Sequence, residues 1–235
     1  MKENKYIINA SIGLFAILIY FTYSYLQIGF LDLLHVDYQA MSLSFKVIYL
    51  IITDVIEMLV LIFLFRKKLK EDVQDLKKNH ESYFKTYFKY WLFALAIMMI
   101  SNLVIMFITE NQTSGNEEAV RRLITKSPIY AYFSSVIFAP FVEEMVFRRS
   151  IRNIIPIDSL FIVISGLVFG GLHIIAGYSG PLDLLYLIPY CAPGLIFAYI
   201  LTKTDNIFVS TGIHLMHNGI MVSLQIFIYL FLGTM

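Results

Sequence analysis

Seven apolar stretches of membrane-spanning length are the feature that most constrains this chain. They cover approximately residues 6–29, 46–66, 87–109, 129–149, 159–176, 183–202 and 207–232. About 20 residues of α-helix cross the hydrocarbon core of a bilayer, which is roughly 30 Å thick. Because lipid offers the backbone no hydrogen-bond partners, each stretch is expected to be helical. We therefore predict an all-α, polytopic membrane protein with about seven to eight transmembrane helices around an interior polar cavity.

The composition supports this reading and excludes soluble enzyme folds. Hydrophobic residues make up 58% of the chain and charged residues only 15%, whereas soluble domains are closer to half and a quarter. The net charge of +1 gives no reason to expect nucleic acid as a partner. Cys191 is the single cysteine, so a disulfide framework or thiolate metal cluster is excluded. The lipid bilayer is the expected environment.

Basic residues between the apolar stretches predict the orientation of the chain. The most basic connection is "RKKLKEDVQDLKK", residues 66–78, and such loops favour the cytoplasm. This places the N-terminus inside and the C-terminus outside. The predicted outer loop at 110–128 argues against this orientation, because it carries Arg121, Arg122 and Lys126.

The chain divides into residues 1–124, which carry no recognisable motif, and residues 125–235, where polar residues recur within apolar helices. Three pairs in the second part are spaced four residues apart, which places both members on one helix face. An ionisable residue within a span costs roughly 2.5–3.5 kcal/mol, so such residues normally face a protein interior. We expect these residues to share an interior site. The pairs are Glu144 and Arg148, Phe169 and His173, and His214 and Asn218.

Two adjacent glutamates stand in "FVEEMVFRR". Neighbouring helical residues point about 100° apart, so Glu144 can pair with Arg148 while Glu143 stays free to act as a general base. Taken singly, these residues have plainer explanations. Glu144 and Arg148 form a structural ion pair, an interior histidine is usually hydrogen-bonded, and Phe169 is usually packing. His217 lies off the His214 face, which favours a structural role for it.

Three motifs in order carry a family resemblance. "EEMVFR", "FGGLH" and "HLMHN" resemble the EExxxR, FxxxH and HxxxN motifs of the CAAX protease and bacteriocin-processing (CPBP, or Abi) family of intramembrane proteases. That family includes the type II CAAX prenyl endopeptidases. The resemblance covers about residues 125–220. Arg149 departs from the pattern, because the family commonly has glycine there.

The resemblance implies an intramembrane endopeptidase that acts on a peptide or membrane-associated protein. Glu143 would activate water and His173 would help to hold it, while His214 and Asn218 would stabilise the oxyanion. The site would be shaped by Glu144, Arg148 and Phe169. CAAX-type processing, peptide maturation and bacteriocin immunity all remain open. A bacterial cell membrane is expected, with the cavity open towards the cytoplasm.

The metal dependence of such a site stays open at the level of sequence. Glu143, His173 and His214 would supply three protein ligands for a catalytic zinc and leave one position free. The chain has no HExxH helix, and a metal-free glutamate mechanism is also argued for the family. We expect no structural metal, with zinc as the alternative.

Three other readings compete with this one. "GYSG", residues 177–180, resembles the rhomboid serine protease motif and would make Ser179 a nucleophile, although the neighbouring Pro181 favours a turn. Asp54 and Glu57, three apart in the second stretch, suggest an ion-coupled transporter or a hydrogen-bonded pair beside a cavity. A non-catalytic immunity or scaffold protein of the same fold is the third reading.

Overall fold

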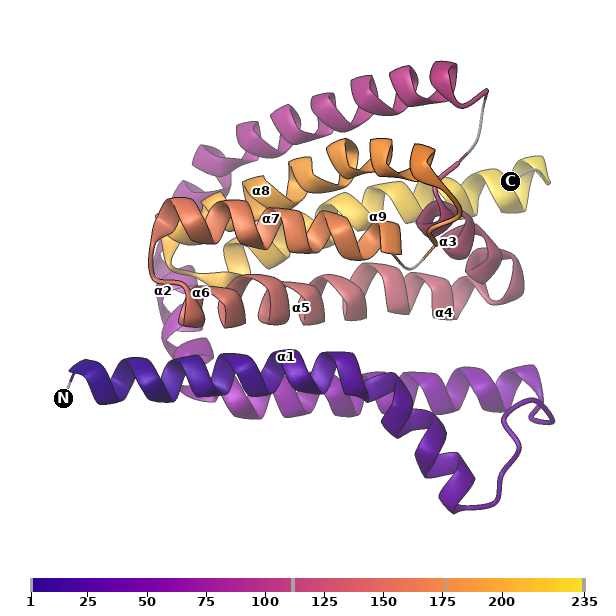
Figure 1. Ribbon diagram of the computed structural model, residues 1–235, viewed down its shortest axis with the longest axis horizontal. Helices are drawn as coiled ribbons and strands as arrows, with labels where there is room; N and C mark the ends of the chain where they lie inside the picture. The colour runs from indigo at the N-terminus through magenta and orange to yellow at the C-terminus, as the bar shows by residue number, and fades with distance from the viewer. Residues whose placement is uncertain (1, 111–112, 176, 234–235) are drawn as a thin grey trace.

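The computed structural model describes residues 2–110, 113–175 and 177–233, and this part of the chain is helical without any strand (Figure 1). Six helical segments are long and apolar enough to cross a membrane. The predicted all-α class is therefore confirmed. The elements are α1 (Lys2–Leu33), α2 (Leu43–Ile108), α3 (Gly115–Lys126), α4 (Pro128–Tyr132), η1 (Phe133–Phe138), α5 (Ala139–Glu143), η2 (Glu144–Ser150), α6 (Ile151–Ile154), α7 (Asp158–Ile175), η3 (Pro181–Tyr186), α8 (Leu187–Thr204) and α9 (Ile207–Leu232).

The basic connection at 66–78 is not a loop, because α2 continues through it. At 1.5 Å per residue, the path of its 66 residues along the helix axis is about 100 Å long, about three times the thickness of a bilayer core. Figure 1 shows α2 running beside α1 towards the N-terminal end, then turning back past α8. Residues 66–86 contain no glycine or proline to end the helix. Lys68 and Asp72, one turn apart, add an ion pair of 2.9 Å.

The predicted span at 129–149 belongs to a helical segment that runs from Pro128 to Ile154. Two π-helical stretches, η1 and η2, lie on either side of the short α5. Pro140 has no N–H to donate to the preceding turn, which accounts for a change of register at this point. In η2, the Ser150 hydroxyl donates to the carbonyl of Met145, five residues earlier, at 2.9 Å. π-helical turns inside longer helices occur frequently at functional sites.

Helices α7 and α8 pack closely because glycines remove side chains from their seam. A Cβ at Gly170 would lie only 3.0 Å from the backbone nitrogen of Cys191, and one at Gly194 would lie 3.0 Å from the carbonyl oxygen of Gly166. Small residues commonly permit such close approach between helices in membranes. This seam fixes the position of α7 and therefore of His173, one turn after Gly170.

Two adjacent glycines in α7 provide a matched test of this seam. Gly170→Ala should destabilise the fold by about 1–3 kcal/mol, because the added methyl group meets Cys191. Gly171→Ala has no neighbour within 4 Å, and helix propensity alone predicts a gain of up to about 1 kcal/mol. Thermal unfolding of the two purified variants in detergent measures the difference. Equal unfolding temperatures would show that the seam is not tightly packed.

Candidate active site

A cavity of about 470 Å³ lies between the second half of α2 and helices α3, α7, α8 and α9. Polar side chains from separate elements meet there, although the surrounding helices are largely apolar. Three of these side chains are predicted site residues, and all three come from the second half of the chain. They are His173, His214 and Asn218.

The predicted ion pair between Glu144 and Arg148 is present and completely buried. Arg148 Nε lies 3.3 Å from Glu144 Oε1, and both side chains are 0% exposed. The guanidinium group also lies 4.2 Å from the Phe169 ring and 5.5 Å from the Phe197 ring. An arginine over an aromatic face is attracted by the ring quadrupole. Phe169 therefore contacts the cation as well as filling space.

His214 lies between the two adjacent glutamates. Its Nδ1 is 3.1 Å from Glu144 Oε1, and its Nε2 is 3.7 Å from Glu143 Oε2. An ionised carboxylate only accepts hydrogen bonds, so Nδ1 donates to Glu144. The Glu143 side chain is 15% exposed, whereas that of Glu144 is fully buried. One carboxylate is thus fixed, and the other is partly exposed beside the same imidazole, although Glu143 itself is not among the residues that line the cavity.

His173 presents an unprotonated nitrogen in its neutral form. Its Nδ1 lies 2.8 Å from the Phe169 carbonyl, which can only accept, so Nδ1 carries the proton. Its ring stacks on Tyr190 at 4.9 Å between centroids. The Phe169 ring is 4.5 Å from the His173 ring and 5.7 Å from the His214 ring. Phe169 therefore lies close to both histidines, and all three side chains line the cavity.

Asn218 lines the cavity and also ties α9 to η1. Its side-chain amide donates to the carbonyl of Ser135 at 2.8 Å. An amide nitrogen has two N–H groups, so one remains for another acceptor. The carbonyl of Ser135 belongs to one of the π-helical stretches, which connects that irregular backbone to the candidate site.

His217 also lines this cavity, a position that the expected structural role did not anticipate. Trp91 Nε1 lies 3.2 Å from His217 Nδ1. Because an indole nitrogen can only donate, Nδ1 must accept, and the neutral ring then carries its proton on Nε2. His214 and His217 are three residues apart, which also brings side chains to one helix face. That spacing was the sequence signal that could have placed His217 in the site. The contact with Trp91 could not be foreseen, because Trp91 lies in the first half of the chain.

The predicted zinc ligands are not arranged as a metal site. Across residues 2–110, 113–175 and 177–233, no group of three or more His, Cys, Asp or Glu side chains is placed to hold a metal ion. His214 Nδ1 donates to Glu144, which leaves only its Nε2 for a metal. As arranged, Glu143, His173 and His214 are not grouped to hold a catalytic zinc in the described part of the chain.

Ser179 has a local structural partner. Its hydroxyl donates to Asp183 Oδ2 at 2.9 Å, and its backbone N–H donates to the same oxygen at 2.6 Å. It precedes η3 in a non-helical segment, and it is not among the residues that line the candidate cavity. This arrangement agrees with the expected turn.

Asp54 and Glu57 are buried in α2, at 4% and 3% exposure. Tyr130 donates to Asp54 Oδ2 at 3.0 Å. Neither carboxylate is among the residues lining the candidate cavity. The alternative reading, in which Asp54 and Glu57 take part in ion-coupled transport, stays a prediction.

The cavity lining extends from His214 to α3, where it includes Asn116 and Arg121. Figure 1 shows α3 at the same end of the bundle as the C-terminus, whereas the N-terminus and the basic part of α2 lie at the other end. The predicted opening towards the cytoplasm remains a prediction. If the basic end is cytoplasmic, α3 marks the outer end of the cavity.

This arrangement has the parts needed for hydrolysis. An accessible carboxylate can take a proton from water. Preorganised N–H donors can stabilise an oxyanion, and removing one commonly costs about 10²–10³ in rate. Glu143 can take the first role, and the N–H groups of His217 and Asn218 can take the second.

Comparison with known proteins relates this chain to membrane peptidases. Residues 125–220 match the family described as type II CAAX prenyl endopeptidase Rce1-like. The relative named "Putative membrane peptidase YdiL", from Bacillus subtilis (strain 168), is 31% identical over 116 residues. That match covers 48% of this chain but only 44% of YdiL. The membrane-embedded CAAX protease MroQ of Staphylococcus aureus (strain USA300) is 27% identical over 206 residues, 81% of this chain and 79% of MroQ. No solved structure matches.

The family match confirms the resemblance expected from the three motifs. Both relatives are bacterial and are named as membrane proteins. Together with the six apolar helices, they support a multi-pass bacterial membrane protein.

Proposed function

We propose that this protein, whose residues 125–220 match the family described as type II CAAX prenyl endopeptidase Rce1-like, is a membrane endopeptidase that uses Glu143 to activate water. The contrast between the two adjacent glutamates carries this proposal. Glu144 is fully buried and paired with Arg148, whereas Glu143 is 15% exposed beside His214. A catalytic base has to reach water, and only Glu143 of the two can do so.

In the first chemical step, Glu143 removes a proton from a water molecule that His173 Nε2 helps to orient. The water oxygen attacks the scissile carbonyl carbon and forms a tetrahedral oxyanion. The N–H groups of His217 and Asn218, which line the candidate cavity with His173, donate to this oxyanion. When the C–N bond breaks, protonated Glu143 returns its proton to the leaving amine.

His214 has a different part from the one first expected. In the neutral ring its one N–H is used by Glu144, so it donates to an oxyanion only in its doubly protonated form. Its Nε2 faces Glu143 and is suited to share the proton that moves during the reaction. Glu144 and Arg148 hold this imidazole in place.

The proposed substrate is a peptide segment of a membrane-associated protein. The family name and the name of MroQ suggest CAAX-type processing, while peptide maturation and immunity functions use the same chemistry. The cavity of about 470 Å³ lies within the usual size range of ligand pockets.

A comparison of peptide termini across the proteome tests both activity and substrate. Cells carrying the wild type are expected to contain new termini that are lost with Glu143→Gln. Glu118→Gln serves as the matched control, because Glu118 lies on α3 and its side chain is 53% exposed. Unchanged termini in cells that keep a wild-type phenotype would favour the scaffold reading. Ion-coupled uptake in reconstituted vesicles, abolished by Asp54→Asn, would favour transport.

A further inference from the structure

A second cavity, of about 870 Å³, lies at the other end of the bundle from α3. It is formed by the start of α1, the basic part of α2, the segment around α6, and Asp205 between α8 and α9. It shares no lining residue with the candidate active site. Nothing in the proposed peptidase mechanism uses it.

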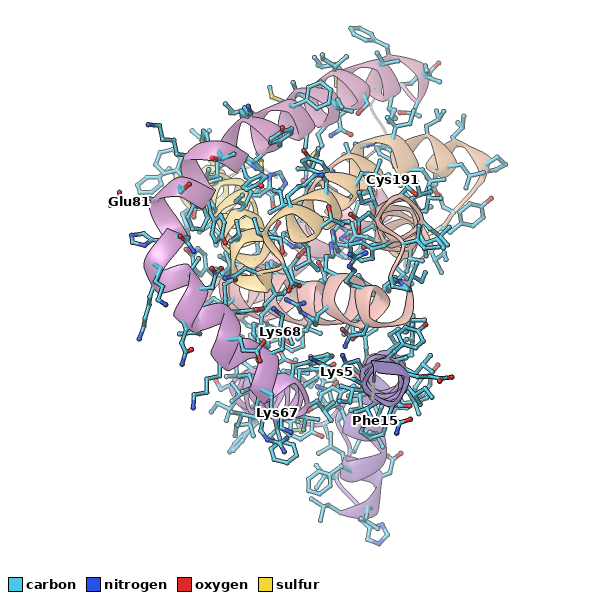
Figure 2. All side chains as sticks on the ribbon, turned by 90° about the vertical axis from the view of Figure 1, so that its left-hand side faces the viewer. Lys5, Phe15, Lys67, Lys68, Glu81 and Cys191 are labelled. Carbon is cyan, nitrogen blue, oxygen red and sulfur yellow. The ribbon has the colours of Figure 1, made fainter. Side chains whose placement is uncertain are left out.

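The lining of this cavity is strongly basic. Six lining residues are cationic and two are acidic, an excess of four positive charges. Figure 2 shows three of the cations, Lys5, Lys67 and Lys68, close together on the face towards the viewer. The cations are Lys5, Arg66, Lys67, Lys68, Arg149 and Arg152, and the acids are Glu71 and Asp205.

Two of the cations are neutralised by a buried network that forms the wall. Arg149 Nη2 lies 2.8 Å from Asp72 Oδ2, and Lys68 Nζ lies 2.9 Å from Asp72 Oδ1. Both cations also pair with Asp205. The Arg149 side chain is 4% exposed, and its Nε has no hydrogen-bond partner in the described part of the chain. Arg149 therefore forms part of this wall.

A third cation, Arg152, pairs with Asp158, but two lysines of the lining are available to a ligand. Lys5 and Lys67 are exposed, and neither forms an ion pair with any other described residue. They come from different helices, α1 and α2, yet line the same cavity. An anion between them would receive donors from both sides.

The cavity also has an apolar side, formed by Ile8, Ile12, Leu64 and Phe65. Ile8 and Ile12 lie in the early part of α1, and Leu64 and Phe65 lie within α2 just before its basic segment; both helices are apolar enough to cross a membrane. A small inorganic anion would gain nothing from such a wall, whereas an amphiphile would place its charged head by the lysines and its glycerol and acyl carbons by the apolar residues.

We propose that this cavity binds the phosphate-bearing headgroup of an anionic phospholipid, with Lys5 and Lys67 contacting the phosphate. The lipid would bridge α1 and α2 at the point where both reach the basic end of the bundle. This binding does not depend on the proposed peptidase activity.

Native mass spectrometry of the full chain in detergent tests the proposal by titration with phosphatidylglycerol. A lysine near an anionic surface contributes about a factor of five in affinity. Lys5→Gln/Lys67→Gln should therefore weaken binding about 25-fold. Phosphatidylcholine with the same acyl chains, which has no net charge, should bind far more weakly than phosphatidylglycerol.

Lys77→Gln/Lys78→Gln is the matched control, because it removes the same charge from α2 outside the cavity lining. We expect it to change binding less than twofold. Equal weakening by both double variants would overturn the proposal, because the effect would then reflect overall charge. Equal binding of the two lipids would overturn it as well. Displacement of phosphatidylglycerol by an equal concentration of inorganic phosphate would assign the cavity to the free anion instead.

Discussion

Arg148→Met is expected to lower the free energy of unfolding by about 3–5 kcal/mol, since the change leaves Glu144 buried without its cation. Both side chains are 0% exposed, and the guanidinium group also contacts Phe169 and Phe197. Methionine keeps much of the length and apolar packing of the arginine side chain. The loss of stability therefore comes mainly from removing the positive charge. Unfolding of the purified protein in detergent, followed by circular dichroism, measures it.

The matched control is Arg122→Met. Arg122 pairs with Glu118 at the same four-residue spacing, but these side chains are 63% and 53% exposed. Exposed helix pairs contribute only about 0.3–0.5 kcal/mol. Glu144→Gln/Arg148→Met should recover part of the lost stability, because neither charge then remains. Similar losses for Arg148→Met and Arg122→Met would contradict the view that burial makes the first pair important.

His217→Leu is expected to reduce turnover by about 10²–10³-fold, the usual effect of losing one oxyanion donor. His217→Gln should retain much more activity, because its side-chain amide can present an N–H near the position of Nε2. Trp91→Phe should give an intermediate loss, since the ring of His217 loses the donor that holds its proton on Nε2. The measurements are kcat and KM on a peptide identified from the comparison of termini.

Stability must be separated from catalysis in this series. His217→Leu leaves the buried indole N–H of Trp91 without an acceptor, which costs about 1–3 kcal/mol. Trp91→Phe/His217→Leu should restore part of that stability but not the activity. If the double variant recovered both stability and turnover, the role of His217 would be purely structural. A change in KM with unchanged kcat would likewise argue against its role as an oxyanion donor.

Local spacing was sufficient to predict part of this arrangement. The contact between Glu144 and Arg148 follows from a four-residue interval on a helix. The apolar stretches predicted the helices because a bilayer leaves the backbone few alternatives. Both inferences depend on residues that are close in sequence.

Other features depend on contacts that sequence spacing does not reveal. The hydrogen bond between Trp91 and His217 joins residues 126 positions apart. The continuity of α2 through its basic segment was missed because charge was read as a loop signal, although charged residues such as Lys and Glu are good helix formers. The π-helical stretches η1 and η2 could not be inferred from apolar periodicity, because that pattern does not distinguish a π-helical turn from an α-helical one.

The length of α2 bears on how the protein could be shortened. The motifs all lie after residue 125, so a fragment comprising residues 125–235 would keep every residue of the proposed mechanism. It would nevertheless lose Met98, Asn102 and Met106, which close one side of the candidate cavity, and the tryptophan that orients His217. In such a fragment the cavity would be open on the side that α2 now covers, and lipid or detergent would enter it. The first half of the chain is therefore an integral part of the cavity wall and cannot be removed as a separate membrane anchor.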